Sequence, residues 1–407
     1  MTTRRPAPGA TYLAVLVLLL AAAAPTRCRS NAADDVIAAS FVGDARRPFE
    51  HLARDPDTGA LYVGAVNALY RLDANLTRHE AATTGPRDDD VGCSLGRPCA
   101  TGVPTDNHNK VLVVDAARGR LVVCGSVAHG VCDVRPLAAI SSVARAAPTT
   151  PVAANNASAP TVAFLAPGPR GRSVLVVGAT VATHDGGAAA APTTSAYWDS
   201  VKAVASRTLE DDGDPATSDL FRFVAKDAVS SLGTFVGFRS GTGSHRLTYP
   251  ILYRSGFSAG GFSYLTTVQR ATLDPGAPYV SKVARVCEAD VEYRSFSEAR
   301  LVCAAPPGDD AGGDYDVLQA ATSGRIGRDL AADLGLTPQD EVLVGVFARA
   351  RSDDGGGAPS WEPSGDSALC LYRLLDVERT FATNERKCRD GYGSSIYWTG
   401  TMQDCVK

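Results

Sequence analysis

The sequence predicts an all-β protein built from many short antiparallel strands, and two observations carry that prediction. Short β-rich runs recur along several hundred residues, and many of them are bounded by Gly, Asp or Asn, as hairpin turns require. Strands of this length at this spacing suit a propeller or a large barrel. The runs span residues 61–64, 68–72, 111–115, 121–124, 173–178, 220–225, 262–269, 280–287, 342–347 and 369–374.

The clearest local signal is a hairpin in "LYVGAVNALYRLD". Residues 61–63 and 68–72 are rich in β-forming side chains, and they flank a turn of small residues between Gly64 and Asn67. This segment is therefore predicted to form two adjacent strands.

Three segments break the strand pattern. In "DYDVLQAATSGRIGRDLAADLGL" the apolar residues fall at helical intervals and end near Gly335, which predicts an inserted helix. Those apolar residues are Val317, Leu318, Ile326, Leu330 and Leu334. Residues 145–160 and 186–194 are rich in Ala, Pro and Thr or Gly and are predicted to be flexible surface loops.

The N-terminus carries the signs of export. Arg4 and Arg5 precede an unbroken apolar run, 12–24, which is too short to cross a membrane. Residues 1–30 are therefore predicted to be a secretory signal peptide, with cleavage after Ser30 favoured over cleavage after Ala23. Residues 31–407 are predicted to form one domain. No later stretch reaches the roughly 18 apolar residues of a membrane helix, so no membrane span is predicted in this chain.

Export determines how the ten cysteines are interpreted, because thiols form disulfides in an oxidising compartment. Cys124 and Cys132 are predicted to clip a hairpin, a closure of about nine residues that stabilises by roughly 2.5 kcal/mol. A zinc site would need four compactly spaced ligands, and the nearby His108 and His129 do not supply that pattern. No metal or other cofactor is predicted. Spacing alone leaves the wider connectivity open.

The charge and the remaining motifs argue against nucleic-acid and calcium binding and indicate glycosylation. The net charge of −4 and the lack of a basic stripe argue against nucleic acid as a partner. The run 88–90 lacks the spacing of a calcium loop and is predicted to be a solvated turn. Two sequons predict glycosylation at Asn75 and Asn156.

An enzyme is the main alternative from another class. A secreted propeller hydrolase or lyase would bring carboxylates, or a Ser, a His and an acid, together near a central channel. The chain has neither a Gly-x-Ser-x-Gly elbow nor a His-Glu-x-x-His motif. We therefore predict a protein without catalytic residues.

A family resemblance adds what periodicity does not supply. "HLARDPDTGALYVGAVNALYRLDANLT", "TGPRDDDVGC", "DNHNKVLVVD" and "RLVVCGSVAHGVCD" resemble, in order and at natural spacing, the N-terminal sema domain of plexins. "SGFSAGGFSYLTTVQR", "YVSKVARVCEAD" and "DSALCLYRLLDVERTF" resemble later blocks of the same domain. The resemblance covers about 41–405.

Related families share the sema propeller. A semaphorin would carry a Cys-x-Asn-Tyr/Phe-Ile type segment where this chain has "DNHNKVLVVD". The scatter-factor receptor tyrosine kinases are the closest competitors, since they also resemble "VVCGSVAHGVC". The tail "CRDGYGSSIYWTGTMQDCVK" keeps the short Cys-to-Cys interval of plexins, and "DSALCLY" with "SGFSAGGFSYL" leans toward the B type.

The plexin resemblance implies a sema-type seven-bladed β-propeller of four-stranded blades. It pairs Cys93 with Cys99, Cys124 with Cys132, Cys303 with Cys370, and Cys388 with Cys405. Cys287 is then expected to be unpaired in this chain, and His129 is expected to be a loop residue where plexins often carry an aromatic. The chain is expected to lack the final blade or blades, as a fragment or truncated isoform, and to be poorly secreted or to aggregate because an open propeller leaves an unpaired edge.

The function that the resemblance implies is recognition of semaphorins by propeller-to-propeller contact, in a cell-surface receptor for cell and axon guidance. A co-receptor or a second plexin is a further expected partner, and a soluble semaphorin-binding decoy is an alternative role. The chain is expected in the secretory pathway and outside the cell. The ligand-binding residues are unknown. Loops between 180 and 244 offer candidates: Tyr197, Trp198, Arg222 and Arg239.

Overall fold

Short antiparallel strands make up most of the described chain, as the sequence predicts. The computed structural model describes residues 39–90, 92–93, 101–146, 150–180, 200–210, 220–226, 249–272, 274–291, 293, 295–306, 313–351 and 360–390. The elements below all belong to one compact unit, Gly43–Lys407. The predicted signal peptide, 1–30, lies outside the described residues.

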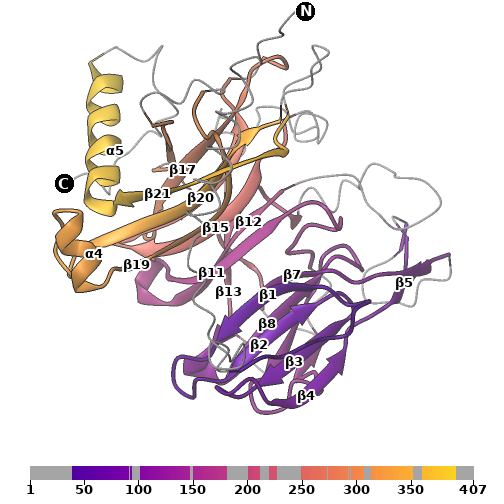
Figure 1. Ribbon diagram of the computed structural model, residues 1–407. Coiled ribbons are helices and arrows are strands. Elements are labelled where there is room, and N and C mark those ends of the chain that lie inside the picture. Colours follow the sequence, from indigo (N-terminus) through magenta and orange to yellow (C-terminus); the bar gives the residue numbers. More distant parts are fainter. Residues whose placement is uncertain are drawn as a thin grey trace, which may run out of the picture. The chain divides into compact units, whose positions relative to one another are not determined.

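Within this part of the protein the strands form five antiparallel sheets of three or four strands in chain order, and one separate two-stranded sheet (Figure 1). The first sheet contains β1 (Phe49–Arg54), β2 (Leu61–Ala65), β3 (Ala68–Leu72) and β4 (Arg78–Thr83). The second contains β7 (Asn109–Asp115), β8 (Arg120–Gly125), β9 (Cys132–Pro136) and β10 (Arg145–Ala146). The third contains β11 (Thr161–Pro167), β12 (Ser173–Ala179), β13 (Val204–Thr208) and β14 (Phe223–Lys226).

The last two sheets follow the same plan. The fourth contains β15 (Leu252–Ala259), β16 (Phe262–Arg270), β17 (Tyr279–Cys287) and β18 (Ser297–Arg300). The fifth contains β19 (Val317–Arg325), β20 (Glu341–Ala350) and β21 (Pro363–Arg373). The smaller elements are the pair β5 (Arg87–Asp89) and β6 (Val103–Thr105), the 3-10 turns η2 (Ala116–Arg118) and η3 (Pro169–Gly171), and the helices α4 (Arg328–Asp333) and α5 (Leu374–Arg389).

The sheets are the blades of a propeller. The first strand of each sheet contacts the first strand of the next, in the order β1, β7, β11, β15 and β19. Five blades, numbered here in chain order, lie within the described residues. The predicted propeller is confirmed.

Side-chain alternation explains why the blades stack. Successive residues of a strand point to opposite faces of its sheet. On β8, Leu121 and Val123 belong to the core between blades 1 and 2, whereas Val122 and Cys124 belong to the core between blades 2 and 3. Both faces of the strand are thereby buried, which favours a nearly continuous apolar run over an alternating one.

The predicted hairpin at 61–72 is confirmed. Strands β2 and β3 pair from Leu61 opposite Leu72 to Ala65 opposite Ala68. Asn67 in the turn has φ +60°, a left-handed conformation that Asn tolerates better than most residues. Most other predicted strand runs also coincide with strands of the structure.

The predicted helix around 314–336 is wrong for its first half. Val317 and Leu318 lie in β19, which pairs along its length with β20. Only Arg328–Asp333 is helical, and the chain leaves α4 through Gly335 at φ +66°. Gly324 and Gly327 lower the helical propensity of the segment, and pairing with an apolar neighbouring strand overrides a short helical pattern.

Two segments that were predicted to be solvated are buried in part. Residues 151–156 are buried between blades 2 and 3, where the backbone amides of Val152 and Ala153 donate to the Gly130 carbonyl at 3.0 Å each. Gly130 is required there, because a Cβ would lie 2.1 Å from the Ala153 oxygen. Asp89 is also buried, on β5, because that run pairs with β6 and does not form a turn. Residues 186–194 lie outside the described residues.

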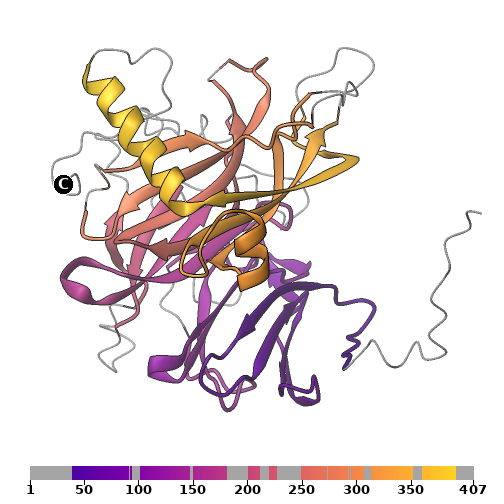
Figure 2. The same cartoon turned by 60° about the vertical axis from the view of Figure 1, so that its left-hand side comes forward.

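Helix α5 was not predicted from the sequence. It follows β21 directly and contacts β18, β20 and β21, so that it joins blade 4 to blade 5 (Figure 2). Its buried side chains, Leu374, Val377 and Phe381, belong to the core shared by those two blades. No helix among the described residues is long and apolar enough to cross a membrane.

Candidate functional site

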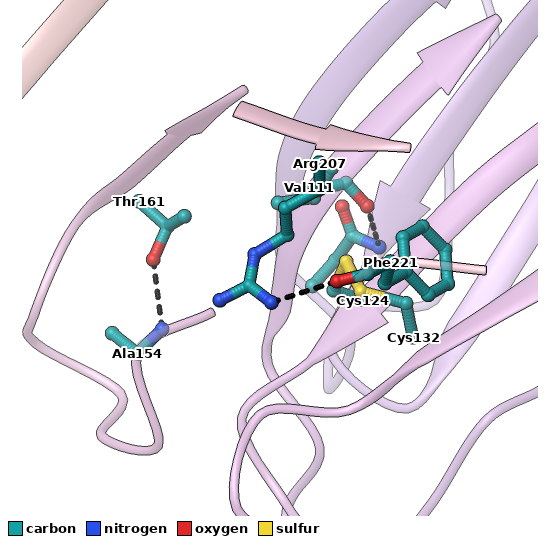
Figure 3. The surroundings of a disulfide bond; sticks show 8 residues. Val111, Cys124, Cys132, Ala154, Thr161, Arg207 and Phe221 are labelled. Carbon is teal, nitrogen blue, oxygen red and sulfur yellow. Dashed lines mark hydrogen bonds between the residues drawn. A yellow bond between two sulfur atoms is a disulfide. The ribbon is translucent and has the colours of Figure 1, made fainter. Parts of the chain in front are cut away.

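The predicted disulfide between Cys124 and Cys132 is present and closes the hairpin of β8 and β9. The two residues are direct cross-strand partners, with Cα atoms 3.9 Å apart, and both are fully buried. Their sulfurs pack in the same core as Val111 and Phe221, from blades 2 and 3 (Figure 3). The disulfide therefore stabilises a blade and its contact with the next one.

His129 is part of the same structural unit. It lies in the turn between β8 and β9 at φ +61°, and only 4% of it is exposed. Its Nε2 lies 2.8 Å from the backbone oxygen of Cys93. The predicted loop position is correct, but the imidazole is a buried tie to the Cys93 segment.

The second described disulfide joins two blades. Cys303 follows β18 in blade 4 and is bonded to Cys370 on β21 in blade 5, 67 positions further along the chain. This pairing was implied by the plexin resemblance, and the structure contains it. Both cysteines pack in the core shared by blades 4 and 5.

The expectation that Cys287 is unpaired is wrong. Cys287 is disulfide-bonded. The unpaired thiol was implied by the pairing pattern of plexins, but pairing is decided by which Cβ atoms the fold of this chain brings together. Cys93 is also disulfide-bonded. Cys99, Cys405 and the side chain of Cys388 lie outside the described residues, so the pairs proposed for them stay predictions.

A buried ionic cluster clamps α5 to blade 4. The guanidinium of Arg285 on β17 lies between two rings, 4.3 Å from the centre of Phe262 and 4.5 Å from that of Phe381. Its Nη2 donates to Glu385 Oε1 at 2.8 Å, and both side chains are 8% exposed. Burial raises the pKa of the neighbouring Tyr264 to about 12, so its phenol is neutral at physiological pH.

Blade 3 contains one buried arginine, Arg207, and one exposed arginine, Arg222. Arg207 donates to the Phe221 carbonyl at 2.9 Å (Figure 3). Its guanidinium also covers the Phe223 ring, 4.3 Å from the ring centre. Burial lowers the pKa of Arg207 to about 9, and the guanidinium stays charged at neutral pH. Arg222, one of the predicted recognition candidates, is exposed. The other candidates, Tyr197, Trp198 and Arg239, lie outside the described residues.

Exposed nonpolar side chains were missed by the sequence analysis. Leu369 on β21 is 71% exposed and lies opposite Val346 on β20, which is 42% exposed. Leu52 on β1 is 68% exposed. Strand alternation could have placed Leu369 and Val346 on one face of blade 5, had their register been known.

The two predicted glycosylation sites differ in accessibility. Asn75 is exposed in the turn between β3 and β4. Asn156 is 6% exposed, and its Oδ1 accepts hydrogen bonds from the Ser158 hydroxyl at 2.7 Å and from two backbone amides. A glycan on the Asn156 amide does not fit this buried loop.

We expect the secreted chain to carry its N-linked glycan at Asn75 and none at Asn156. Asn75→Gln should remove the glycan mass, and Asn156→Gln is the matched control that should leave it unchanged. Intact-mass and glycopeptide mass spectrometry measure both. A glycan found on Asn156 in folded protein would contradict the burial of this loop.

Within the described residues no group of three or more His, Cys, Asp or Glu side chains could hold a metal ion. Buried charged side chains in blade 4 form an ion pair with each other instead. Lys282 and Glu298, both fully buried in blade 4, lie 3.2 Å apart, and Gln269 donates to the same carboxylate at 2.9 Å.

Known proteins with similar sequences indicate the family to which this fold belongs. No family model matches the chain. Human Plexin-A2 is 30% identical over 375 residues, and human Plexin-B1 is 31% identical over 375 residues; each alignment covers 88% of this chain. The alignments cover 18% and 16% of those relatives, so the chain spans less than a fifth of their length.

Solved structures show the same fold. The full extracellular region of Plexin A4 aligns with a TM-score of 0.64 and 22% identity, over 88% of this chain and 38% of that one. Drosophila Semaphorin 2a aligns with a TM-score of 0.53 and 15% identity, over 91% of this chain and 54% of that one.

Successive antiparallel blades, one clipped internally by a disulfide and two joined by another, match these structures and define a sema-type β-propeller. Together with the sequence relatives, this fold places the chain in the plexin family, as a sema domain.

Proposed function

We propose that the chain is the extracellular ligand-recognition domain of a plexin-like receptor and that its ligand is a semaphorin. The observation that carries the proposal is the 31% identity to human Plexin-B1 across 88% of the chain. Contact is made between the propeller of this domain and the sema propeller of the ligand. A co-receptor or a second plexin chain is a further partner of this extracellular domain.

The physical character of the domain supports recognition by a rigid surface. Disulfides within blade 2 and between blades 4 and 5 hold the strands in place, and α5 is fixed by the buried pair of Arg285 and Glu385. A preorganised surface loses little conformational entropy on binding. A specific interface of this kind buries on the order of 1,200–2,000 Å².

The same features support an extracellular, non-catalytic role. Disulfides persist in the secretory pathway and outside the cell. The buried ionisable groups in the described blades serve as ties within and between sheets, as in the pair of Lys282 and Glu298. Recognition then depends on exposed side chains and on the complementarity of charge with the partner.

The test is surface binding of the secreted, monomeric chain to a panel of semaphorin ectodomains. We expect saturable binding to at least one semaphorin, and we expect a human Plexin-B1 ectodomain in solution to compete for it. The variants Tyr197→Ala, Trp198→Ala, Arg222→Glu and Arg239→Glu then test the candidate recognition residues. Absence of binding to every semaphorin by a folded monomer would refute the proposal.

A further inference from the structure

A group of polar side chains lies where blades 1, 2 and 3 meet, close to the first strands of those blades. We call it the inner-edge cluster: Glu50, His51, His108, Asn109 and Lys110. Glu50 and His51 belong to β1, Asn109 and Lys110 belong to β7, and His108 directly precedes β7. Strands β1 and β7 are in contact, so the cluster spans a junction between blades.

Glu50 holds the start of β7 against β1. Its Oε1 lies 2.5 Å from Nδ1 of His108, and its Oε2 accepts the backbone amide of Asn109 at 2.5 Å. The Asn109 side chain lies against the backbone of Gly64, where an added Cβ would be 2.3 Å from Asn109 Oδ1. The two blades therefore fit closely at this point.

Lys110 extends the cluster to blade 3. The residue is buried, and its Nζ donates to the carbonyl oxygens of Ala157 at 2.6 Å and Ala159 at 3.1 Å. Those carbonyls belong to the loop that leads into β11. One buried ammonium thus ties the second blade to the entry of the third.

His51 is the side chain of the cluster whose protonation would be unfavourable in the closed junction. It pairs with Gly64 on β2, and its Nδ1 is buried without a hydrogen-bond partner among the described residues. Burial lowers the pKa of His51, and the Lys110 ammonium adds to that shift; the Glu50 carboxylate and hydrogen bonds to the backbone and side chain of Asn109 oppose it without reversing it. Protonation would place a second cation in the region that already holds Lys110.

We propose that the inner-edge cluster is an acid-sensitive latch, in which protonation of His51 loosens the junction between blades 1 and 2. At neutral pH the imidazole is uncharged and the junction is closed. On acidification the unfolded or opened segment binds a proton more readily than the closed one, so the closed form loses stability. The loss begins as the pH falls through 6.5, the ordinary pKa of histidine. A receptor carried from the neutral cell surface into an acidified compartment would cross this range.

His108, the second histidine of the cluster, differs from His51 in facing a carboxylate directly, since its Nδ1 lies 2.5 Å from Glu50 Oε1. Carboxylate and imidazolium attract each other, so this contact is not the one that a proton would break. The acid response therefore depends on His51, and the two histidines can be separated by substitution.

The test is hydrogen exchange of the secreted chain at pH 7.4 and pH 5.5, corrected for the intrinsic rates of exchange. We expect the exchange of β1 and β7 to rise at pH 5.5 by up to about tenfold, the limit for a histidine that stays neutral in the closed form. In His51→Gln the rise should fall below about twofold, because glutamine does not titrate. The matched control is His79→Gln, whose exposed imidazole faces Asp73. It should behave as the unmodified chain.

Two results would overturn the latch. One is the absence of an acid-induced rise in β1 and β7, and the other is an equal rise in His51→Gln. A second measurement serves if His51→Gln does not fold: an NMR titration of the histidine rings in the unmodified chain. The latch requires that His51 remain neutral at pH 6.5 and below, and a midpoint at or above 6.5 would contradict it.

Discussion

Replacing Cys303 and Cys370 together with alanine is expected to lower the free energy of unfolding by about 4 kcal/mol. The bond closes a loop of 67 positions, and the chain entropy that a disulfide removes from the unfolded state grows with the length of that loop. The loss should also separate blade 5 from blade 4, because the two cysteines lie in the core that those blades share. Denaturant unfolding of the secreted chain, followed by tryptophan fluorescence, measures the change.

The matched comparison is the double replacement of Cys124 and Cys132. This disulfide spans only 8 positions, so the same entropic reasoning gives about 2.5 kcal/mol. It lies within blade 2, and its loss should leave the exchange rates of blade 5 unchanged. An equal or larger loss of stability from the shorter loop would show that loop closure does not explain how these bonds stabilise the propeller.

Glu385→Ala is expected to destabilise the chain by about 3 kcal/mol, since removal of one partner leaves a buried charge without compensation. The charge in question is Arg285, which is held between Phe262 and Phe381 and is 8% exposed. The first consequence should be release of α5 from blade 4. Denaturant unfolding gives the free energy, and hydrogen exchange of α5 shows where the structure opens.

The control lies on the same helix. Asp376 pairs with Arg379 at 2.8 Å, but the two side chains are 58% and 65% exposed. Asp376→Ala should therefore cost less than about 1 kcal/mol. Replacing both Arg285 and Glu385 with methionine should recover much of the stability lost in Glu385→Ala, because no unpaired charge is then buried. Equal effects of Glu385→Ala and Asp376→Ala would contradict the clamp.

The strands could be predicted well because their signals are local. The hairpin at 61–72 has β-forming residues on both sides of a small-residue turn, and the structure pairs them as neighbouring antiparallel strands. The strands around Cys124 and Cys132 follow from the same pattern, and a short cysteine spacing in an exported chain is a reliable sign of a clip.

The errors concern contacts that are distant in sequence. Val317 and Leu318 fit a helical pattern, yet β20 pairs with their segment and makes it a strand. Helix α5 could have been predicted from Leu374, Val377 and Phe381, which recur at helical spacing. The predicted strand 369–374 overlaps the start of this helix, so strand and helix signals coincide at Leu374.

Buried polar groups were the least predictable part of the candidate site. Lys282 and Glu298 are charged and would ordinarily be assigned to the surface, but each is compensated by the other inside blade 4. The Asn156 sequon lies in a segment with the composition of a loop, and only the packing of that loop against Gly130 and Lys110 buries it. Pairing partners of this kind are defined by the fold, and composition does not indicate them.

Isothermal titration of the folded, monomeric secreted chain with semaphorin ectodomains in solution tests directly whether this propeller is a recognition domain. We expect a saturable heat of binding to at least one semaphorin, with one chain bound per semaphorin protomer. A folded monomer that gives no heat with any semaphorin, under conditions in which a plexin ectodomain does, would contradict the claim that this propeller is a recognition domain.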